Sequence, residues 1–261
     1  MASDNWGNTI VVDWWQALVA GFLAEGNAAP PIAGRATGYT ATSAASNKTI
    51  RATTYTPQTV TGQRSVASSS ANDTAAGTGA QQIMLTYLTS AFVLESELIT
   101  LNGTTPVNTV GTDILYVESM VVTQTGTSSG TNLGTISLYT GTAGSGSVWA
   151  SIAVNSGVGD NMTFWAAHYV PAGVTCYITS MAAAAYGVLG TMSLLRHGNP
   201  SLTNQPLTQI GPTLLHPAGD QREHQFQVPL AVQGPDLIEM ISHPVSATSD
   251  TSLGTFEYVQ F

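Results

Sequence analysis

Short runs of alternating apolar and polar residues, separated by turns of Gly, Thr, Ser and Asn, constrain this chain more than any other feature. Ile83, Leu85 and Tyr87 lie two residues apart in one such run, and Phe226 and Val228 begin another. A period of two places alternate side chains on opposite faces of a strand, so these runs predict β-structure. Beyond the N-terminal segment no helical pattern separates them, which argues against an α/β fold.

The predicted strands recur at short intervals through most of the chain. They are 50–55, 63–68, 81–88, 92–101, 114–123, 135–139, 149–154, 162–170, 174–181, 191–195, 223–232, 237–241 and 256–261. Strands at this spacing are typical of a sandwich or barrel, and their number favours an eight-stranded jelly roll with additions. We therefore expect an all-β, jelly-roll-like β-sandwich over residues 51–261. Pro229 predicts that its strand lies at a sheet edge or carries a bulge.

A six-residue pattern, Leu-Gly-Thr-Ile-Ser-Leu, begins at Leu133 and recurs with one change at residues 189–194. A shorter copy, Leu-Gly-Thr-Phe, occupies residues 253–256. In each copy a Gly precedes a β-forming run, so we expect that Gly to open a strand as a turn residue with positive φ.

Residues 1–50 differ from the rest and predict an N-terminal arm with a short apolar helix and a linker. Asp13 resembles a helix N-cap, and Gly26 is a plausible stop. The helix is about three turns long and marginal alone in water, so it must dock on something. Its own domain, a neighbouring subunit and a membrane are the alternatives, and the lack of basic residues argues against a membrane. Residues 33–46 are small and polar, as in a linker.

The segment from Gly198 to Gly219 contains four prolines and lacks alternation. A connection this long is typical of a contact surface, and we expect a rim that touches neighbouring subunits. Together the arm and the rim supply the candidate partner contacts, namely Trp6, Trp14, Trp15, Leu18, Phe22, Leu23, Pro206 and Pro212.

Charge is scarce in this sequence. Charged residues make up 8% of the chain, against roughly 25% in ordinary soluble proteins, and the net charge is −9. An acidic surface repels phosphate, so we expect no nucleic-acid partner. A surface of Thr, Ser, Asn and Gln suits a protein packed in an assembly. The first cation is Arg35, so no secretory signal is predicted. Cys176 is the one cysteine, and its alternating neighbours predict a buried, inert thiol.

Patterns that suggest catalysis are weak. Residues 126–130 match the Gly-x-Ser-x-Gly nucleophile motif, but both flanks are β-like, whereas that motif requires a following helix. Glu95 and Glu97 share one strand face, as catalytic carboxylates do, although a solvated sheet explains them better. We therefore expect no enzymatic activity.

Signals for bound ligands are also weak. His216 and His224 flank a turn without the tight spacing of metal ligands, and Asp160 with Asn161 lacks a calcium-loop pattern. We expect no metal and no cofactor. Five aromatic residues have two alternative roles, stacking on a bound sugar or packing in the core, and we favour the core. They are Trp149, Trp165, Tyr169, Tyr177 and Tyr186.

Residues 69–83 and 101–109, followed by the strand that starts at Asp113 and the Asn-Leu-Gly-Thr-Ile run at Asn132, resemble a recurrent block in structural proteins of tailed bacteriophages. The resemblance covers about a third of the chain. It implies a virion component and transfers no catalytic residues. The expected role is a capsid cement or decoration protein on the outer capsid surface. Its partners would be the major capsid protein and copies of itself, as a homotrimer. The alternative is a tail, fibre or baseplate module that recognises a host receptor or glycan.

Overall fold

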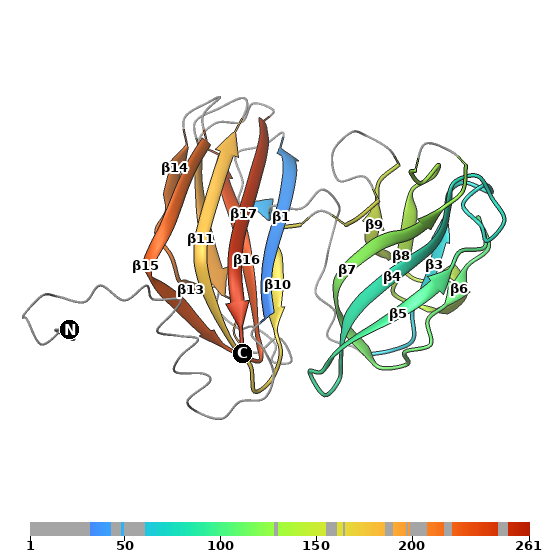
Figure 1. Ribbon diagram of the computed structural model, residues 1–261, viewed down its shortest axis with the longest axis horizontal. Helices are drawn as coiled ribbons and strands as arrows, with labels where there is room; N and C mark the ends of the chain where they lie inside the picture. The colour runs from blue at the N-terminus through green and yellow to red at the C-terminus, as the bar shows by residue number, and fades with distance from the viewer. Residues whose placement is uncertain are drawn as a thin grey trace, which may run out of the picture.

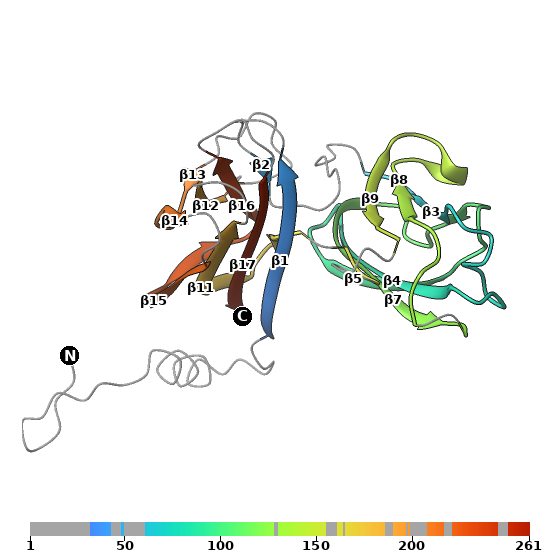
Figure 2. The same cartoon turned by 90° about the horizontal axis from the view of Figure 1, so that it is seen from above.

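In the computed structural model, the described residues are 32–42, 48–49, 61–127, 130–154, 161–163, 165–185, 190–196, 198, 208–216, 221–244 and 250–261. Apart from one 3-10 turn, Thr142–Gly144, every regular element among them is a strand. The strands build two β-sandwich modules that lie side by side (Figure 1; Figure 2). Within the described part of the chain, no helix meets the length and hydropathy that crossing a bilayer requires.

The larger module is a sandwich of two antiparallel sheets. The front sheet has the order β1 (Ile32–Thr42), β17 (Asp250–Gln260), β11 (Thr175–Ala185) and β15 (Gln221–Gln233). The back sheet has the order β10 (Ala167–Val170), β16 (Asp236–Pro244), β12 (Gly190–Arg196) and β13 (Thr208–Gln209). Two short strands complete it: β14 (Leu214–His216) pairs with β12, and β2 (Lys48–Thr49) pairs with β16.

One strand of the back sheet is interrupted by a long insertion. Thr49 of β2 pairs with Ile241, and Ala167 of β10 pairs with Glu239 on the same edge of β16. The Met240 N–H donates to the carbonyl of Ala166 at 2.9 Å, which fills the position between these two pairs. Thr49 and Ala166 therefore occupy consecutive places along a single strand line, and the chain between them leaves the sheet and returns.

Counting β2 with β10, and β13 with β14, as single strand positions gives eight positions in the two sheets. We number these positions along the chain. Across the front sheet, the neighbouring positions are then the first, eighth, third and sixth, and across the back sheet they are the second, seventh, fourth and fifth. This is the double Greek-key order of a jelly roll. The predicted all-β, jelly-roll-like sandwich is confirmed. We call β1, β2 and β10–β17 the jelly roll.

The inserted module, residues 61–163, is a second and smaller sandwich. One of its sheets has the order β6 (Val107–Asn108), β3 (Ser65–Ser68), β8 (Ile136–Tyr139) and β9 (Val148–Ile152). The other has the order β5 (Leu94–Thr100), β4 (Ala80–Thr89) and β7 (Ile114–Thr125). The residues that resemble phage structural proteins lie in this module.

Each module has its own core, and the core of the inserted module extends into the jelly roll. Between its two sheets lie Leu85, Ile136 and the ring of Trp149, and the same cluster includes Tyr169 and Leu237 from the jelly roll. The jelly roll encloses a separate cluster that contains Cys176, Met181, Met192, Phe226 and Phe256. Because one cluster spans the boundary, the two modules are packed together through apolar contact as well as joined by the chain.

Two expectations about the N-terminal fifty residues have different outcomes. The linker predicted over residues 33–46 is wrong for residues 33–42, since Ile32–Thr42 forms β1 and pairs along its whole length with β17. The small Gly, Ala and Thr residues of β1 show no apolar alternation, so the sequence did not predict a strand there. The large apolar side chain at this place in the core is Phe256 of β17, which pairs with Ala36. The predicted apolar helix lies outside the described residues.

The strand that contains Pro229 meets both sequence expectations. β15 is at the edge of the front sheet, and its pairing with β11 jumps from Gln225–Ser180 to Leu230–Ile178. The residues between these pairs form a bulge, in which Val228 is exposed. A bulge and a proline at an edge prevent pairing with another strand, so this edge is protected against sheet extension.

Candidate functional site

The structure describes one of the eight predicted partner contacts. Pro212 is exposed between β13 and β14, which both pair with β12, and its role as a contact stays a prediction. The other seven predicted contacts lie outside the described residues: Trp6, Trp14, Trp15, Leu18, Phe22, Leu23 and Pro206.

The paired carboxylates of β5 have structural partners. The Tyr87 hydroxyl donates to Oε2 of Glu95 at 3.3 Å, and Glu97 Oε2 accepts the N–H groups of Val110 at 2.7 Å and Gly111 at 3.2 Å. Burial, with the charges of Glu97 and Glu95 beside it, raises the pKa of Tyr87 to about 12. These carboxylates therefore hold a hairpin and a loop in place.

The other residues that gave weak sequence signals for a site make ordinary structural contacts. His224 lies edge-on to Phe226, with ring centroids 4.8 Å apart, and Asn161 donates from Nδ2 to the carbonyl of Gly130 at 2.6 Å. Among the described residues, no group of three or more His, Cys, Asp or Glu side chains is placed to hold a metal. Gly130 leads through a turn into β8 and not into a helix, contrary to the nucleophile motif.

Four of the residues predicted to lie in the core are buried, whereas Tyr177 is half-buried and Tyr186 lies outside the described residues. Cys176 is fully buried, and burial raises the pKa of its thiol well above the ordinary range. Trp149, Trp165 and Tyr169 are buried as well. The expected burial of Cys176 and of these three aromatic residues is thus confirmed.

Asp73 is a buried hub that holds the inserted module together. Its carboxylate accepts four hydrogen bonds, from Ser68 Oγ at 2.6 Å and from the N–H groups of Ala80, Leu133 and Gly134 at 2.8–2.9 Å. It thereby ties the turns before β4 to the turn before β8. Gly134 lacks the predicted positive φ. A Cβ there would lie 2.4 Å from Ser70 N, so close approach is what requires glycine.

The junction between the modules centres on Glu118 of β7. Its Oε1 lies 2.6 Å from Nδ1 of His168, and its Oε2 accepts the N–H of Tyr169 at 3.1 Å. The Glu118 carbonyl accepts the indole N–H of Trp165 at 2.9 Å. One residue of the inserted module is thus bound to three residues around β10. Sequence reasoning missed this site, since the partners are about fifty residues apart and share no motif.

His168 connects this junction to the front sheet. Its Nε2 lies 3.0 Å from Oε1 of Gln260, and its ring stacks on Tyr258 with centroids 3.9 Å apart. Burial and the nearby Glu118 raise the pKa of Tyr258 above its ordinary range. Gly34 leaves room for this ring, because a Cβ there would lie 2.4 Å from Tyr258 Cζ.

The tip of the β4–β5 hairpin forms a second contact across the junction. Phe92 stacks on Tyr169 with centroids 6.2 Å apart and planes 4° from parallel, and Tyr116 lies 5.1 Å from the same ring. Phe92 has φ of 60°, a region that side-chain-bearing residues rarely adopt. The strained turn directs the phenyl ring into the junction.

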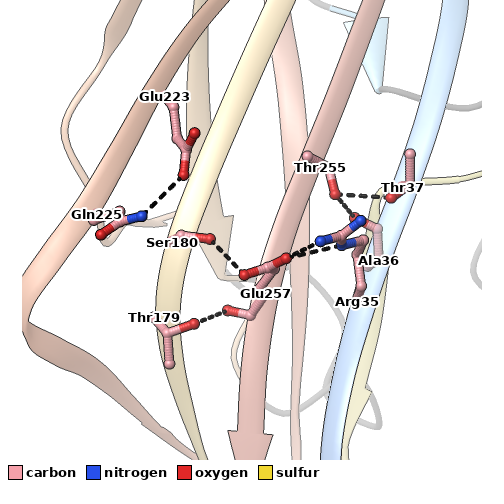
Figure 3. A network of polar contacts seen from close by, with 9 residues as sticks. All are labelled: Arg35, Ala36, Thr37, Thr179, Ser180, Glu223, Gln225, Thr255 and Glu257. Atoms are coloured by element: carbon pink, nitrogen blue, oxygen red, sulfur yellow. Dashed lines mark hydrogen bonds and ion pairs between the residues drawn. The ribbon is translucent and has the colours of Figure 1, made fainter.

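The outer face of the front sheet is a polar network whose members bond one another (Figure 3). Arg35 pairs with Glu257, which also accepts Ser180 Oγ at 3.2 Å, and the hydroxyls of Thr37 and Thr255 are 2.7 Å apart. Hydrogen bonding to Arg35 lowers the pKa of Glu257. This face is hydrophilic, yet most of its charge is neutralised within the network.

Comparison with known proteins places the chain in no family. No protein-family model matches it, and no curated protein does. Two solved structures of infectious bursal disease virus, from the Gt and Gx strains, are similar to it at TM-scores of 0.24 and 0.23. Their sequence identities are 8% and 9%; the matches cover 89% and 88% of this chain and 72% and 71% of theirs. Similarity at this level carries no argument about function.

Proposed function

We propose that this protein is a structural component of a bacteriophage virion: a capsid cement or decoration protein, with no enzymatic activity. In this proposal it binds the major capsid protein from the outer surface and associates with copies of itself as a homotrimer. The resemblance of residues 69–83 and 101–109 to phage structural proteins supports the virion assignment. The jelly-roll topology is compatible with it, since this fold is common in virus capsids.

One observation carries the proposal: much of the scarce charge is used to hold the protein together. Asp73 is buried among hydrogen-bond donors, and Glu118 is bound across the junction. Arg64 is 4% exposed, donates to the Ile114 carbonyl at 2.9 Å and lies over Trp149. Buried Asp236 pairs with Arg196. Such a protein has little charge left for solubility alone, as expected of a subunit that functions inside an assembly.

Electrostatics supports the proposed position on the outer surface of the particle. A net charge of −9 disfavours contact with packaged nucleic acid, which favours the outer surface. The arm residues Trp14, Trp15 and Phe22 are proposed to supply the apolar contacts to neighbouring subunits. A stable interface buries more than about 1,000 Å² in total, and several aromatic side chains would provide a large share of that area.

Labelling of purified particles tests the virion role. Gold-conjugated antibodies against this protein should decorate the capsid shell in electron micrographs, and its peptides should persist in gradient-purified particles. Label confined to the tail would replace the proposal with the receptor- or glycan-binding alternative. Absence of the protein from particles would overturn the virion role altogether.

A deletion tests the arm separately. The variant lacking residues 1–30 should keep its β-rich circular dichroism and lose binding to capsids in co-sedimentation. Gln16→Ala is the matched control, because it changes a polar position of the same segment. Unchanged occupancy of the shell by the deletion variant would refute the role of the arm and leave the virion role standing.

A further inference from the structure

A row of apolar side chains crosses the outer face of the three-stranded sheet of the inserted module. Leu98 of β5 pairs with Met84 of β4, Met84 pairs with Val121 of β7, and Val121 forms a bridge with Met162. Leu98 is 54% exposed, Met84 37% and Met162 41%. We call these four residues the apolar row. At the usual spacing between strands it is about 15 Å long.

Polar residues border the apolar row along the strands, and one end of the row lies in a cleft. The next positions along the strands carry hydroxyls, since Thr86 pairs with both Ser96 and Ser119. At its other end, Val121 and Met162 line a cleft of about 480 Å³ between the two modules. The opposite wall is Arg35, Ala36 and Thr37 of β1, with Tyr258. The surface is therefore a narrow apolar track that ends between the modules.

The first described strand begins near this cleft. The structure is described from Ile32, which is 59% exposed and lies three residues before Arg35 of the cleft wall. The preceding residues include the apolar run from Ile10 to Ala24, which needs a surface to cover it. The described chain therefore begins close to the cleft in which the apolar row ends.

We propose that residues 14–23 cover the apolar row of their own molecule before assembly. The predicted helix of about 15 Å equals the row in length, at 1.5 Å per residue. Leu18 and Phe22 are four residues apart, the spacing with which a helix presents anchors to a groove. Met84 and Met162 suit such a partner, since methionine adapts to irregular apolar surfaces.

The length of the connection favours the same molecule over a second copy. Residues 24–31 separate the proposed helix from β1 and reach at most about 28 Å when extended. Met162 is within that reach, because it lines the same cleft as Arg35, which lies three residues from Ile32. A short tether gives an effective concentration in the millimolar range, well above that of free copies in dilute solution.

Hydrogen exchange tests the contact in the free, full-length protein. Amides of residues 14–23 should be protected, and Met84→Asp with Leu98→Asp should speed their exchange at least tenfold. The control, Thr86→Asp with Ser96→Asp, changes the neighbouring row of the same face and should leave that protection intact. Equal exchange in both double variants, or no protection in the unmodified protein, would overturn the proposal.

Cysteine cross-linking identifies the molecule to which the segment belongs. A Leu18→Cys/Met84→Cys variant should form an intramolecular disulfide under mild oxidation, while buried Cys176 stays unmodified. Mixing the two single variants should give no cross-linked dimer. A dimer from that mixture as abundant as the intramolecular product would assign the row to the arm of a second copy. Either result is independent of whether the protein is found on virions.

Discussion

Oε1 of Glu118 lies 2.6 Å from Nδ1 of His168, across the boundary between the inserted module and the jelly roll. Both side chains are largely buried, with 15% and 3% of their surfaces exposed. A buried pair contributes chiefly through what its loss leaves behind, namely an uncompensated polar group in a low-dielectric site. This contact therefore contributes to holding the two modules together, beside the apolar cluster that they share.

Removing the carboxylate should weaken the junction. We expect Glu118→Ala to lower the free energy of unfolding by about 3–5 kcal/mol, because His168 and the N–H of Tyr169 both lose an acceptor. Urea denaturation followed by tryptophan fluorescence measures it. Glu223→Ala, on the exposed face, should change stability by less than about 0.5 kcal/mol. If Glu118→Ala and His168→Ala proved additive in the double variant, the two side chains would not be coupled.

At position 92, a glycine variant should be more stable than an alanine variant, which is the reverse of the usual order. Its positive φ favours glycine, so Phe92→Gly should be more stable than Phe92→Ala by up to about 1 kcal/mol, although both lose the contact with Tyr169. Thermal or urea unfolding of the two variants measures the difference. Ala91→Gly, at the preceding exposed position, should instead be slightly destabilising. Phe92→Gly less stable than Phe92→Ala would show that the turn is not strained.

Replacing Asp73 even by a side chain of equal size should destabilise the protein. Asp73→Asn replaces one carboxylate oxygen by an amide nitrogen, so two of the four donors lose their acceptor. At about 1–3 kcal/mol for each buried unsatisfied donor, we expect a loss of roughly 2–6 kcal/mol. Limited proteolysis should cut the variant within the inserted module. Asn72→Ala is the control, and equal proteolysis of the two variants would contradict this role for Asp73.

The Arg35–Glu257 pair should make a small, acid-sensitive contribution to stability. The folded-state pKa of Glu257 is lowered by Arg35, so the contribution is present above the unfolded pKa and is lost as pH falls through the folded pKa. With side chains 65% and 41% exposed, we expect less than about 1 kcal/mol. Carboxyl NMR titration should show the pKa of Glu257 rising in Arg35→Gln and unchanged in Thr37→Val. The same pKa in Arg35→Gln as in the parent would exclude the ion pair as the cause.

The insertion should be removable. Joining Thr49 directly to Ala166 should preserve the strand line along β16, because these residues face consecutive partners. We expect a shorter protein with β-type circular dichroism and a cooperative transition at lower temperature, since Tyr169 and Leu237 lose their cover. A deletion that is one residue out of register, joining Thr49 to Ala167, should lower the transition temperature further. Equal behaviour of the two deletions would argue against a continuous strand.

Alternation was sufficient to predict most strands, because one face of each is buried. β4 illustrates this, with Ile83, Leu85 and Tyr87 in the core and Met84 outside. β1 escaped prediction, since its small residues rely on β17 for apolar cover. The insertion could not be foreseen, because the adjacency of Thr49 and Ala166 exists only through β16. Glu118 likewise has nothing in its local sequence that points to His168; fifty residues and a module boundary separate them.

The pairing of β1 with β17 has a consequence for how the protein is made. Ile32 pairs with Gln260, and among the described strands β17 is the neighbour of β1 in its sheet, so β1 lacks this partner until residues 250–260 have been synthesised. All strands of the inserted module emerge well before that. During translation the smaller sandwich can therefore fold before β1 is paired, and the jelly roll closes in a later step that joins two strands far apart in the chain.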